Sequence, residues 1–156
     1  MPEAWRIVKE KHVAAAFSGE GAARTGGRWN SRGVAVVYTS ASRSLAALEM
    51  LVHLIPPVKF RYKLIPVEFI NDIVERIDKA ALPPDWRAEP PPPSTKRLGD
   101  AWVRLSRSAV LAVPSVIIPA ELNYLLNPAH VDFRKITIGK PVDFAFDPRL
   151  LGGRSV

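Results

Sequence analysis

Three side chains in the first third of the sequence are of the types that build a ligand site: Arg28, Tyr38 and Glu49. Arg28 lies in a segment, residues 19–33, that holds five of the nine glycines of the chain and also carries Arg24 and Arg32. Glycine lets a backbone approach a ligand closely and turn its N–H groups toward an anion, and a guanidinium adds a charged fork that matches phosphate. The segment predicts an anion site. A surface loop with solvated arginines is the alternative that composition alone favours.

Glu49 is the only polar side chain between Leu45 and Val52, in a predicted helix that is apolar almost all round. This pattern favours burial of the helix, and a buried carboxylate requires a partner, a situation that is common at active sites. The alternative, to which the residues give equal weight, is a narrow solvated stripe that continues to His53 one turn further on.

Tyr38, Ser115 and Asn123 are weaker candidates. Tyr38 lies near the end of a predicted strand, where ligand sites often open in mixed α/β structures, although packing is the commoner role of such a tyrosine. Ser115 lies inside an apolar run and would need a hydrogen-bond partner if buried. That partner could be a ligand or the backbone.

Other kinds of site find little support. The chain has no cysteine, which excludes disulfides, thiol catalysis and thiolate metal sites. Its three histidines, His12, His53 and His130, lie far apart and match no zinc-binding spacing. There is no Walker A loop, no dinucleotide-binding Gly-x-Gly-x-x-Gly after a strand and no Gly-x-Ser-x-Gly motif, whereas a Ser–His–Asp arrangement is left open because it depends on geometry.

The size and charge of the chain bound its class. Its 156 residues are the length of one ordinary domain. No apolar window is long enough to span a bilayer and the first residues lack signal-peptide character, so we expect a cytoplasmic protein with no membrane contact. The formal net charge of +7 attracts polyanions, although the nearest approach to a cluster is Lys59, Arg61 and Lys63. Nucleic acid, an acidic protein or a diphosphate ligand would each explain it.

The elements that must position these residues predict a single α+β domain, with a strand-rich mixed sheet as its core and helices beside it. Strands are expected over residues 5–8, 34–39, 60–70, 110–118, 133–138 and 142–146. Pro66 indicates an edge strand or a bulge. Helices are expected over residues 43–54, 100–108 and 121–126, the first capped by Ser42 and stopped by Pro56 and Pro57. Residues 73–82 are ambiguous, and residues 83–93, with six prolines, predict an extended surface loop.

The spacing of these motifs resembles the RES domain, a family named after an Arg, a Glu and a Ser. The first block of the resemblance is long and specific, and it covers residues 19–33, 36–40 and 44–53. A second block, less specific alone but in the same order and spacing, covers residues 113–116 and 121–130. The likeness runs from about residue 5 to residue 146, so the whole chain, 1–156, is expected to be one RES domain.

The resemblance implies a fold similar to ADP-ribosyltransferases and the function of a bacterial toxin that degrades NAD+ or transfers its ADP-ribose. NAD+ is then a substrate, and no cofactor or metal is expected. The implied partner is an Xre-type helix-turn-helix antitoxin, through which alone the toxin would meet nucleic acid. Water, inorganic phosphate or a protein side chain could accept the ADP-ribose.

Carried over by position, the family arginine, tyrosine and glutamate fall on Arg28, Tyr38 and Glu49, the expected catalytic residues. The family serine falls on Ser115, with Ser106 and Ser108 close by in the sequence. Ser115 and the further pocket residue Asn123 are expected to bind NAD+ together with Arg28 and Tyr38. Cleavage of the nicotinamide–ribose bond develops oxocarbenium character, which Glu49 would stabilise while Arg28 grips the diphosphate or a ribose hydroxyl and Tyr38 frames the nicotinamide.

Two other classes of function remain open. A nucleic-acid-acting protein such as an RNase-type toxin fits the net charge, and its affinity would fall steeply with salt. No recognition helix is visible, however, and the aromatic residues are not interleaved with basic ones. A non-catalytic binding module, in which Glu49 is a structural acid, is the third class.

Overall fold

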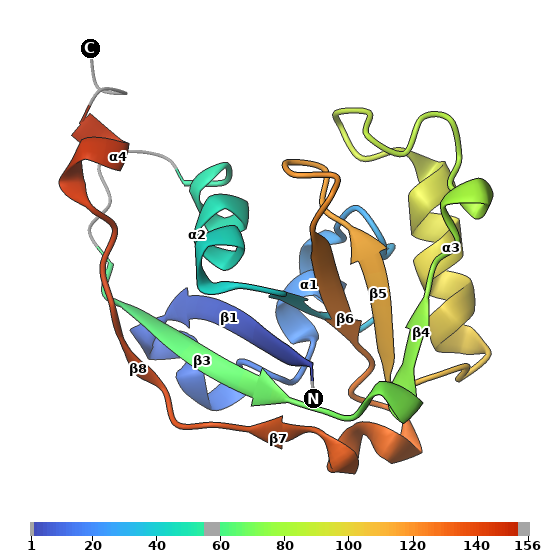
Figure 1. Ribbon diagram of the computed structural model, residues 1–156, viewed down its shortest axis with the longest axis horizontal. Helices are drawn as coiled ribbons and strands as arrows, with labels where there is room; N and C mark the ends of the chain where they lie inside the picture. The colour runs from blue at the N-terminus through green and yellow to red at the C-terminus, as the bar shows by residue number, and fades with distance from the viewer. Residues whose placement is uncertain (1, 55–59, 153–156) are drawn as a thin grey trace.

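A curved mixed sheet runs through the molecule (Figure 1). The computed structural model describes residues 2–54 and 60–152 of the chain. Within these residues the sheet has eight strands: β1 (Glu3–Lys9), β2 (Val37–Ser40), β3 (Tyr62–Glu68), β4 (Val74–Arg76), β5 (Val110–Pro114), β6 (Leu122–Leu126), β7 (Thr137–Ile138) and β8 (Val142–Phe144). They lie in the order β4-β5-β6-β2-β1-β3-β7, and β8 also pairs with β3. The pair β4–β5 is parallel and the other pairs are antiparallel, so the predicted single α+β domain with a mixed sheet is confirmed.

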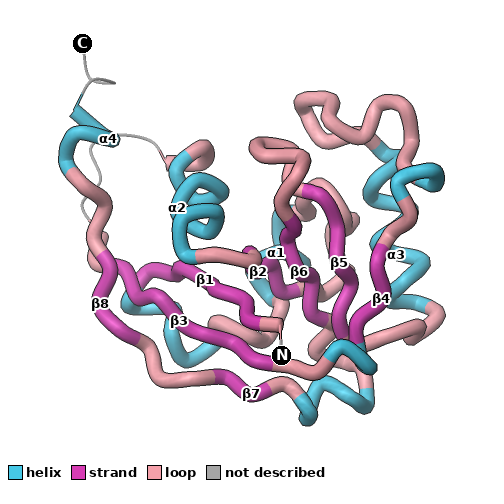
Figure 2. The backbone as a smooth tube through the Cα atoms, in the orientation of Figure 1, coloured by secondary structure: helices cyan, strands magenta, loops and turns pink. Residues whose placement is uncertain are grey.

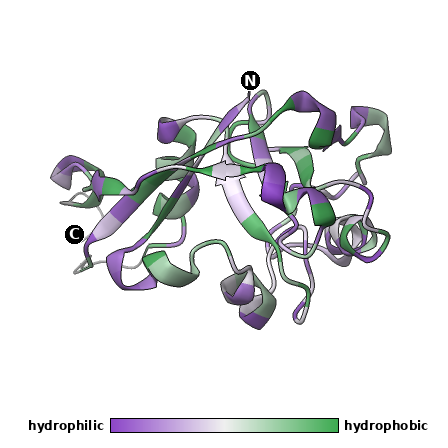
Figure 3. Cartoon of the chain, turned by 90° about the horizontal axis from the view of Figure 1, so that it is seen from below, coloured by the Kyte–Doolittle hydropathy of each residue, from purple (hydrophilic) through white to green (hydrophobic). Residues whose placement is uncertain are grey.

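Helices lie beside this sheet. The α-helices are α1 (Glu20–Thr25), α2 (Arg43–Leu51), α3 (Pro93–Arg104) and α4 (Pro148–Gly152), and 3₁₀ turns cover Glu10–Ala15, Asn71–Ile73, Lys79–Ala81 and Val131–Lys135. Helix α3 is amphipathic, because its buried residues Thr95, Gly99 and Trp102 recur at helical spacing. Helices in Figure 3 accordingly carry both hydrophilic and hydrophobic segments. Trp102 packs against Leu111 of β5 and Leu125 of β6, which fixes α3 on one face of the sheet.

Several local predictions are confirmed. Strand β1 contains the predicted residues 5–8, and β3 lies within the predicted residues 60–70. Ser42 is the N-cap of α2, since its hydroxyl accepts a 3.0 Å hydrogen bond from the backbone N–H of Leu45. The helix ends at Leu51, followed by a turn in which Leu54 N–H donates to the Leu51 carbonyl. Pro56 and Pro57, the predicted stop, lie outside the described residues, as does Lys59.

The prediction of a helix over residues 121–126 is wrong. Leu122–Leu126 is strand β6, which lies between β5 and β2 and pairs through Tyr124 with Ala112 on one side and Thr39 on the other. A six-residue helix has little stability of its own, whereas a central strand forms hydrogen bonds along both edges. Burial of the apolar side chains of Leu125 and Leu126 stabilises the strand further.

Pro66 lies neither on an edge strand nor at a bulge. Strand β3 is paired on both sides, with β1 on one side and with β8 and β7 on the other. Pro66 lies between the residues paired with β8 and those paired with β7, and its carbonyl accepts from the N–H of Gly139 in the connection between them. The break in the outer ladder therefore tolerates a residue that has no N–H to donate.

Other boundaries differ from the prediction for local reasons. Strand β2 begins at Val37 rather than at residue 34, and β5 ends at Pro114. Helix α3 begins at Pro93 rather than at residue 100, because proline is well suited to the first turn of a helix. The predicted strand over residues 133–138 is a 3₁₀ turn followed by the short β7, and β8 is shorter than predicted.

The connections between these elements complete the frame of the site. The ambiguous residues 73–82 contain β4 and a 3₁₀ turn. Residues 83–92 form a loop that joins β4 to α3 (Figure 2). Its first part is not extended as predicted, because the N–H groups of Trp86 and Ala88 donate to the carbonyls of Pro83 and Asp85 and close turns. Among the described residues, none of the helices combines the length and apolar character that a membrane span requires.

Candidate active site

Glu49 is half-buried on α2 and is held by two side chains from the β5–β6 hairpin. Its Oε1 accepts hydrogen bonds from Ser115 Oγ at 2.7 Å and from Asn123 Nδ2 at 2.8 Å. Within the described part of the chain, Oε2 accepts no hydrogen bond. His53, one turn further on, is exposed, and within the described residues its side chain forms no hydrogen bond or ion pair with Glu49. The carboxylate is thus fixed at one oxygen and available at the other.

Ser115 directly follows the last residue of β5 and is fully buried. Its hydroxyl oxygen accepts hydrogen bonds from the backbone N–H groups of Ile117 and Ile118, both at 3.1 Å. A hydroxyl has one proton and two acceptor sites, so the two N–H donors direct that proton to Glu49. Ser108, which lies close to Ser115 in the sequence, instead accepts a hydrogen bond from Trp102 Nε1 and donates one to the Val110 carbonyl.

Asn123 is oriented by a residue that sequence reasoning missed, Ser40. The Ser40 hydroxyl donates to Asn123 Oδ1 at 2.7 Å, which turns the amide nitrogen toward Glu49. Ser40 and Asn123 are opposite each other in the β2–β6 ladder. A signal was present in the sequence, because Ser40 is two residues after Tyr38 and so shares its face of the strand.

Tyr38 is the second residue of β2, rather than near its end, and it fastens the glycine-rich segment to the sheet. Its hydroxyl donates to Asn30 Oδ1 at 2.6 Å and accepts from the backbone N–H of Trp29 at 3.1 Å. Burial raises the pKa of Tyr38 well above the usual range of a phenol. Arg6 of β1 donates to the Tyr38 carbonyl at 2.9 Å, and burial lowers the pKa of Arg6 to about 10.

The glycine-rich segment is ordered against α3. Gly27 lies so close to Tyr38 that an added Cβ would be 2.7 Å from the phenol oxygen, and a Cβ on Gly99 of α3 would be 1.6 Å from the Trp29 carbonyl oxygen. Lys96 Nζ donates to the Gly27 carbonyl at 2.7 Å. Part of the segment is helix α1, and Trp29 and Asn30 are buried, so a freely flexible surface loop is excluded.

Arg28 is bound by the loop that precedes α3. Its Nη1 donates to the carbonyls of Trp86 at 3.1 Å and Ala88 at 2.7 Å, and its Nη2 forms an ion pair with Glu89. The side chain of Arg28 is 12% exposed. Arg24, by contrast, is a surface residue beside Glu20, and Arg32 is exposed, so Arg28 alone of the three predicted arginines is enclosed by neighbouring elements.

Hydrogen bonds and neighbouring positions along β2 link the five predicted residues. Glu49, Ser115 and Asn123 are in direct contact, and Asn123 reaches Ser40, two residues along β2 from Tyr38. Residues two apart on a strand lie about 7 Å apart on the same face. Tyr38 in turn holds the N–H of Trp29, the neighbour of Arg28 in sequence. No hydrogen bond or ion pair within the described residues joins Arg28 or Tyr38 directly to Glu49.

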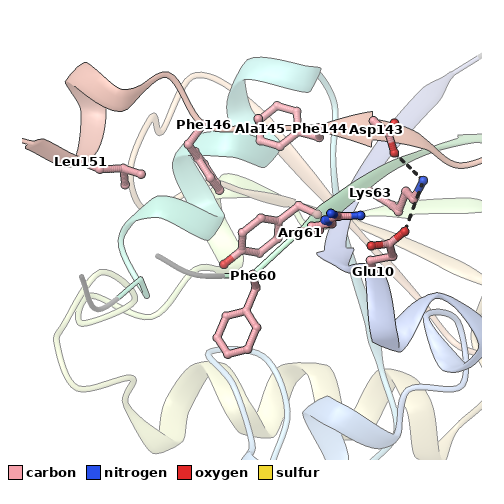
Figure 4. Close-up of a pocket in the computed structure, with 10 residues that line it drawn as sticks. Glu10, Phe60, Arg61, Lys63, Asp143, Phe144, Ala145, Phe146 and Leu151 are labelled. Atoms are coloured by element: carbon pink, nitrogen blue, oxygen red, sulfur yellow. Dashed lines mark hydrogen bonds and ion pairs between the residues drawn. The ribbon is translucent and has the colours of Figure 1, made fainter. Parts of the chain in front are cut away.

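A separate cavity of about 670 Å³ lies along the start of β3, β8 and α4 (Figure 4). Lys63 forms ion pairs with Glu10 and Asp143 at its rim. Tyr62 and Phe146 meet edge to face in its lining, with ring centroids 5.4 Å apart. None of the five predicted site residues is among those that line it, so the cavity is distinct from the candidate site. Over the described residues no cluster of three or more histidine and acidic side chains could hold a metal ion.

The arrangement around Glu49 is suited to a substrate that develops positive charge. A carboxylate whose position is fixed by neutral donors need not reorganise when an electron-poor centre forms beside it. Arg28, bound by the loop before α3, adds a permanent cation, which suits a ligand that also carries phosphate. Two groups of opposite charge, on separate elements and not paired with each other, can bind the two ends of one ligand.

Comparison with known proteins places the chain in a recognised group. The family model of the RES domain matches residues 3–147. The protein "Toxin Res" of Yersinia enterocolitica is 38% identical over 148 residues, covering 94% of this chain and 97% of that protein. The "Prs ADP-ribosylating toxin" of a Sphingobium strain is 40% identical over 156 residues, covering 94% of this chain and 95% of that protein.

The fold is also found in a solved structure. A chain in the crystal structure of the Mycobacterium tuberculosis MbcT–MbcA toxin–antitoxin complex superposes with a TM-score of 0.72 at 17% sequence identity. The match covers 99% of this chain and 89% of that chain. The two chains therefore share one fold over nearly their whole lengths.

Proposed function

The chain belongs to the RES domain family, as its motif spacing predicts, and we propose that it is a toxin that cleaves the nicotinamide–ribose bond of NAD+. One observation carries this proposal: the Glu49 carboxylate is anchored at Oε1 by Ser115 and Asn123 and leaves Oε2 without a hydrogen bond from the described residues. The name of one relative, "Toxin Res", supports the role of a toxin, and that of another, "Prs ADP-ribosylating toxin", supports chemistry on ADP-ribose.

Glu49 acts on the ribose. When the bond between the ribose C1 and the nicotinamide nitrogen breaks, its electron pair leaves with nicotinamide and C1 becomes oxocarbenium-like. Oε2 is the oxygen that can hold a ribose hydroxyl and stabilise this positive charge, because Oε1 is already engaged. Ser115 and Asn123 then act by holding Glu49, with Ser40 behind Asn123.

Arg28 and Tyr38 serve the other parts of the substrate. Arg28 binds the diphosphate through its guanidinium fork. The hydroxyl of Tyr38 is occupied by Asn30 and Trp29, so the tyrosine contributes through the face or edge of its ring, which frames the nicotinamide, and through its hold on the segment that carries Arg28.

A second outcome of the same bond cleavage is transfer of ADP-ribose to a protein. The name of the Sphingobium relative, at 40% identity, favours this acceptor over water or phosphate. The half of the reaction that involves Glu49 is the same in each case, because the acceptor attacks C1 only as nicotinamide leaves. The acceptor therefore has to be identified from the product.

The proposed partner is an antitoxin. The structural neighbour comes from a toxin–antitoxin complex, and we extend this to an Xre-type helix-turn-helix partner in the cytoplasm. Contact with nucleic acid then runs through the partner, and the net charge of +7 offers a surface for its acidic residues.

The experiment is NAD+ consumption by the purified protein, with and without inorganic phosphate, with products resolved by mass spectrometry. We expect nicotinamide release together with ADP-ribose, ADP-ribose-1″-phosphate or, in the presence of a lysate, a modified protein. Glu49→Gln should lose turnover by at least about 100-fold with its fold retained. Glu121→Gln, an exposed glutamate of the β5–β6 connection, is the matched control and should match the wild type. Turnover by Glu49→Gln close to that of this control would refute the role of Glu49.

A further inference from the structure

The guanidinium of Arg28 already holds an anion, the carboxylate of Glu89. The ion pair joins Arg28 Nη2 to Glu89 Oε1, and the side chain of Glu89 is 65% exposed while that of Arg28 is 12% exposed. A diphosphate that binds Arg28 has to use donors of this same guanidinium. The loop residue and the substrate therefore compete for one group.

The remaining contacts of Arg28 come from the backbone of a loop that has further contacts with the rest of the fold. The carbonyls of Trp86 and Ala88 accept from Nη1, and the Trp86 ring packs beside the cluster of Trp29 and Trp102. Elsewhere on this loop, Asp85 Oδ1 accepts a 2.6 Å hydrogen bond from Ser94 Oγ at the start of α3. None of these contacts involves Nη2, so a change of partner at Nη2 does not require any of them to break.

The loop also touches the Glu49 side of the site. Arg87 Nη2 donates to the Val116 carbonyl at 3.0 Å, and Val116 is the neighbour in sequence of Ser115, which holds Glu49. Displacement of the whole loop would break this contact as well as those of Trp86 and Ala88. Rotation of the exposed Glu89 side chain breaks the single ion pair and leaves the other contacts intact, so it is the less costly way to free the guanidinium.

We propose that Glu89 is a resident anion that occupies Nη2 of Arg28 until the diphosphate of the ligand displaces it, and that it thereby sets the affinity of the site. This inference rests on the proposed function, in that it assigns the diphosphate to Arg28. In the free protein Glu89 and the two carbonyls hold the guanidinium in one orientation. In the bound protein the carbonyls keep that orientation while Nη2 binds phosphate. Because the Glu89 side of the ion pair is open to solvent, the pair contributes little, so the exchange is easy and its effect on affinity is a few-fold.

The test measures binding of inorganic pyrophosphate and of ADP-ribose by calorimetry, because neither contains the bond to be cleaved. Glu89→Gln keeps the shape of the side chain and removes its charge, and we expect both probes to bind about 2- to 5-fold more tightly. Glu20→Gln is the control, since it makes the same charge change in an exposed pair with Arg24. The control should bind as the wild type does, and in an Arg28→Ala background Glu89→Gln should have no effect.

The outcomes separate this inference from the proposed function. Equal pyrophosphate affinity in Glu89→Gln and the wild type, or no binding in either, overturns the exchange even if NAD+ is consumed. An equal gain in pyrophosphate affinity in Glu20→Gln also overturns the exchange, because the gain would then result from the change in net charge alone. Tighter pyrophosphate binding by Glu89→Gln that depends on Arg28 supports the exchange even if NAD+ is not consumed, in which case the proposed function fails alone.

Discussion

Replacement of Ser115 by alanine tests the anchoring of Glu49 most directly. The change removes the 2.7 Å hydrogen bond to Glu49 Oε1 and the acceptor for the N–H groups of Ile117 and Ile118. A hydrogen bond to a charged group contributes about 1.5–3 kcal/mol. If that contribution is realised in the transition state, NAD+ turnover falls by about 10- to 150-fold. The two N–H groups that lose their acceptor also cost stability, at up to about 1–3 kcal/mol each.

Ser108→Ala is the matched control for this change. Ser108 is half-buried, accepts from Trp102 Nε1 and donates to the Val110 carbonyl, both at 2.8 Å, and it does not contact Glu49. Both variants should therefore lose stability in denaturant unfolding, whereas Ser115→Ala alone should lose turnover. Asn123→Ala, which removes the other donor to Glu49, should repeat the loss and serves if Ser115→Ala does not fold. A folded Ser115→Ala protein with turnover within about twofold of Ser108→Ala would refute the anchoring argument.

Three further predictions follow from single contacts. Arg28→Ala should lose ADP-ribose binding and NAD+ turnover together, and it should make residues 83–92 more sensitive to protease. The control Arg24→Ala should behave as the wild type does. Unchanged ADP-ribose affinity in Arg28→Ala would count against the role of this arginine. Gly99→Ala should destabilise the fold by more than about 3 kcal/mol in denaturant unfolding, because its Cβ would be 1.6 Å from the Trp29 carbonyl oxygen, and a stable variant would show that α3 can move away. Burial raises the pKa of Tyr38, so the folded protein favours the neutral phenol. The contribution of the neutral phenol to the free energy of unfolding is present below about pH 10 and is lost as the pH rises further. Tyr38→Phe should therefore show a smaller loss of stability at alkaline pH in unfolding experiments.

Much of the local structure could be predicted because short-range chemistry decides it. Ser42 caps α2 through a hydrogen bond to a residue three positions on, and the β-branched residues around Tyr38 form a strand. Prediction failed where long-range pairing decides the outcome. Residues 122–126 form a strand because β5 and β2 supply ladders on both sides. Strand β5 is the preceding element of the chain, but Ser40 of β2 lies 83 positions before its partner Asn123.

The same division holds for the candidate site. The sequence by itself determined the family, the residue types and the element that carries each of Arg28, Tyr38 and Glu49, because motif order and helix or strand pattern are local properties of the chain. The sequence left open whether the Glu49 carboxylate has a hydrogen-bond partner, and it did not indicate that Ser40 or Glu89 belongs to the site.

Only the tertiary structure decided which side chains meet. Glu49 is bonded to Ser115 and Asn123, which lie 66 and 74 residues away in the sequence, and Arg28 to loop residues about 60 positions away. These contacts depend on the register of β2, β5 and β6 and on the close packing of α3 against the glycine-rich segment. A shift of one residue in a strand turns its side chains to the other face, so no pattern within a single element could have fixed them.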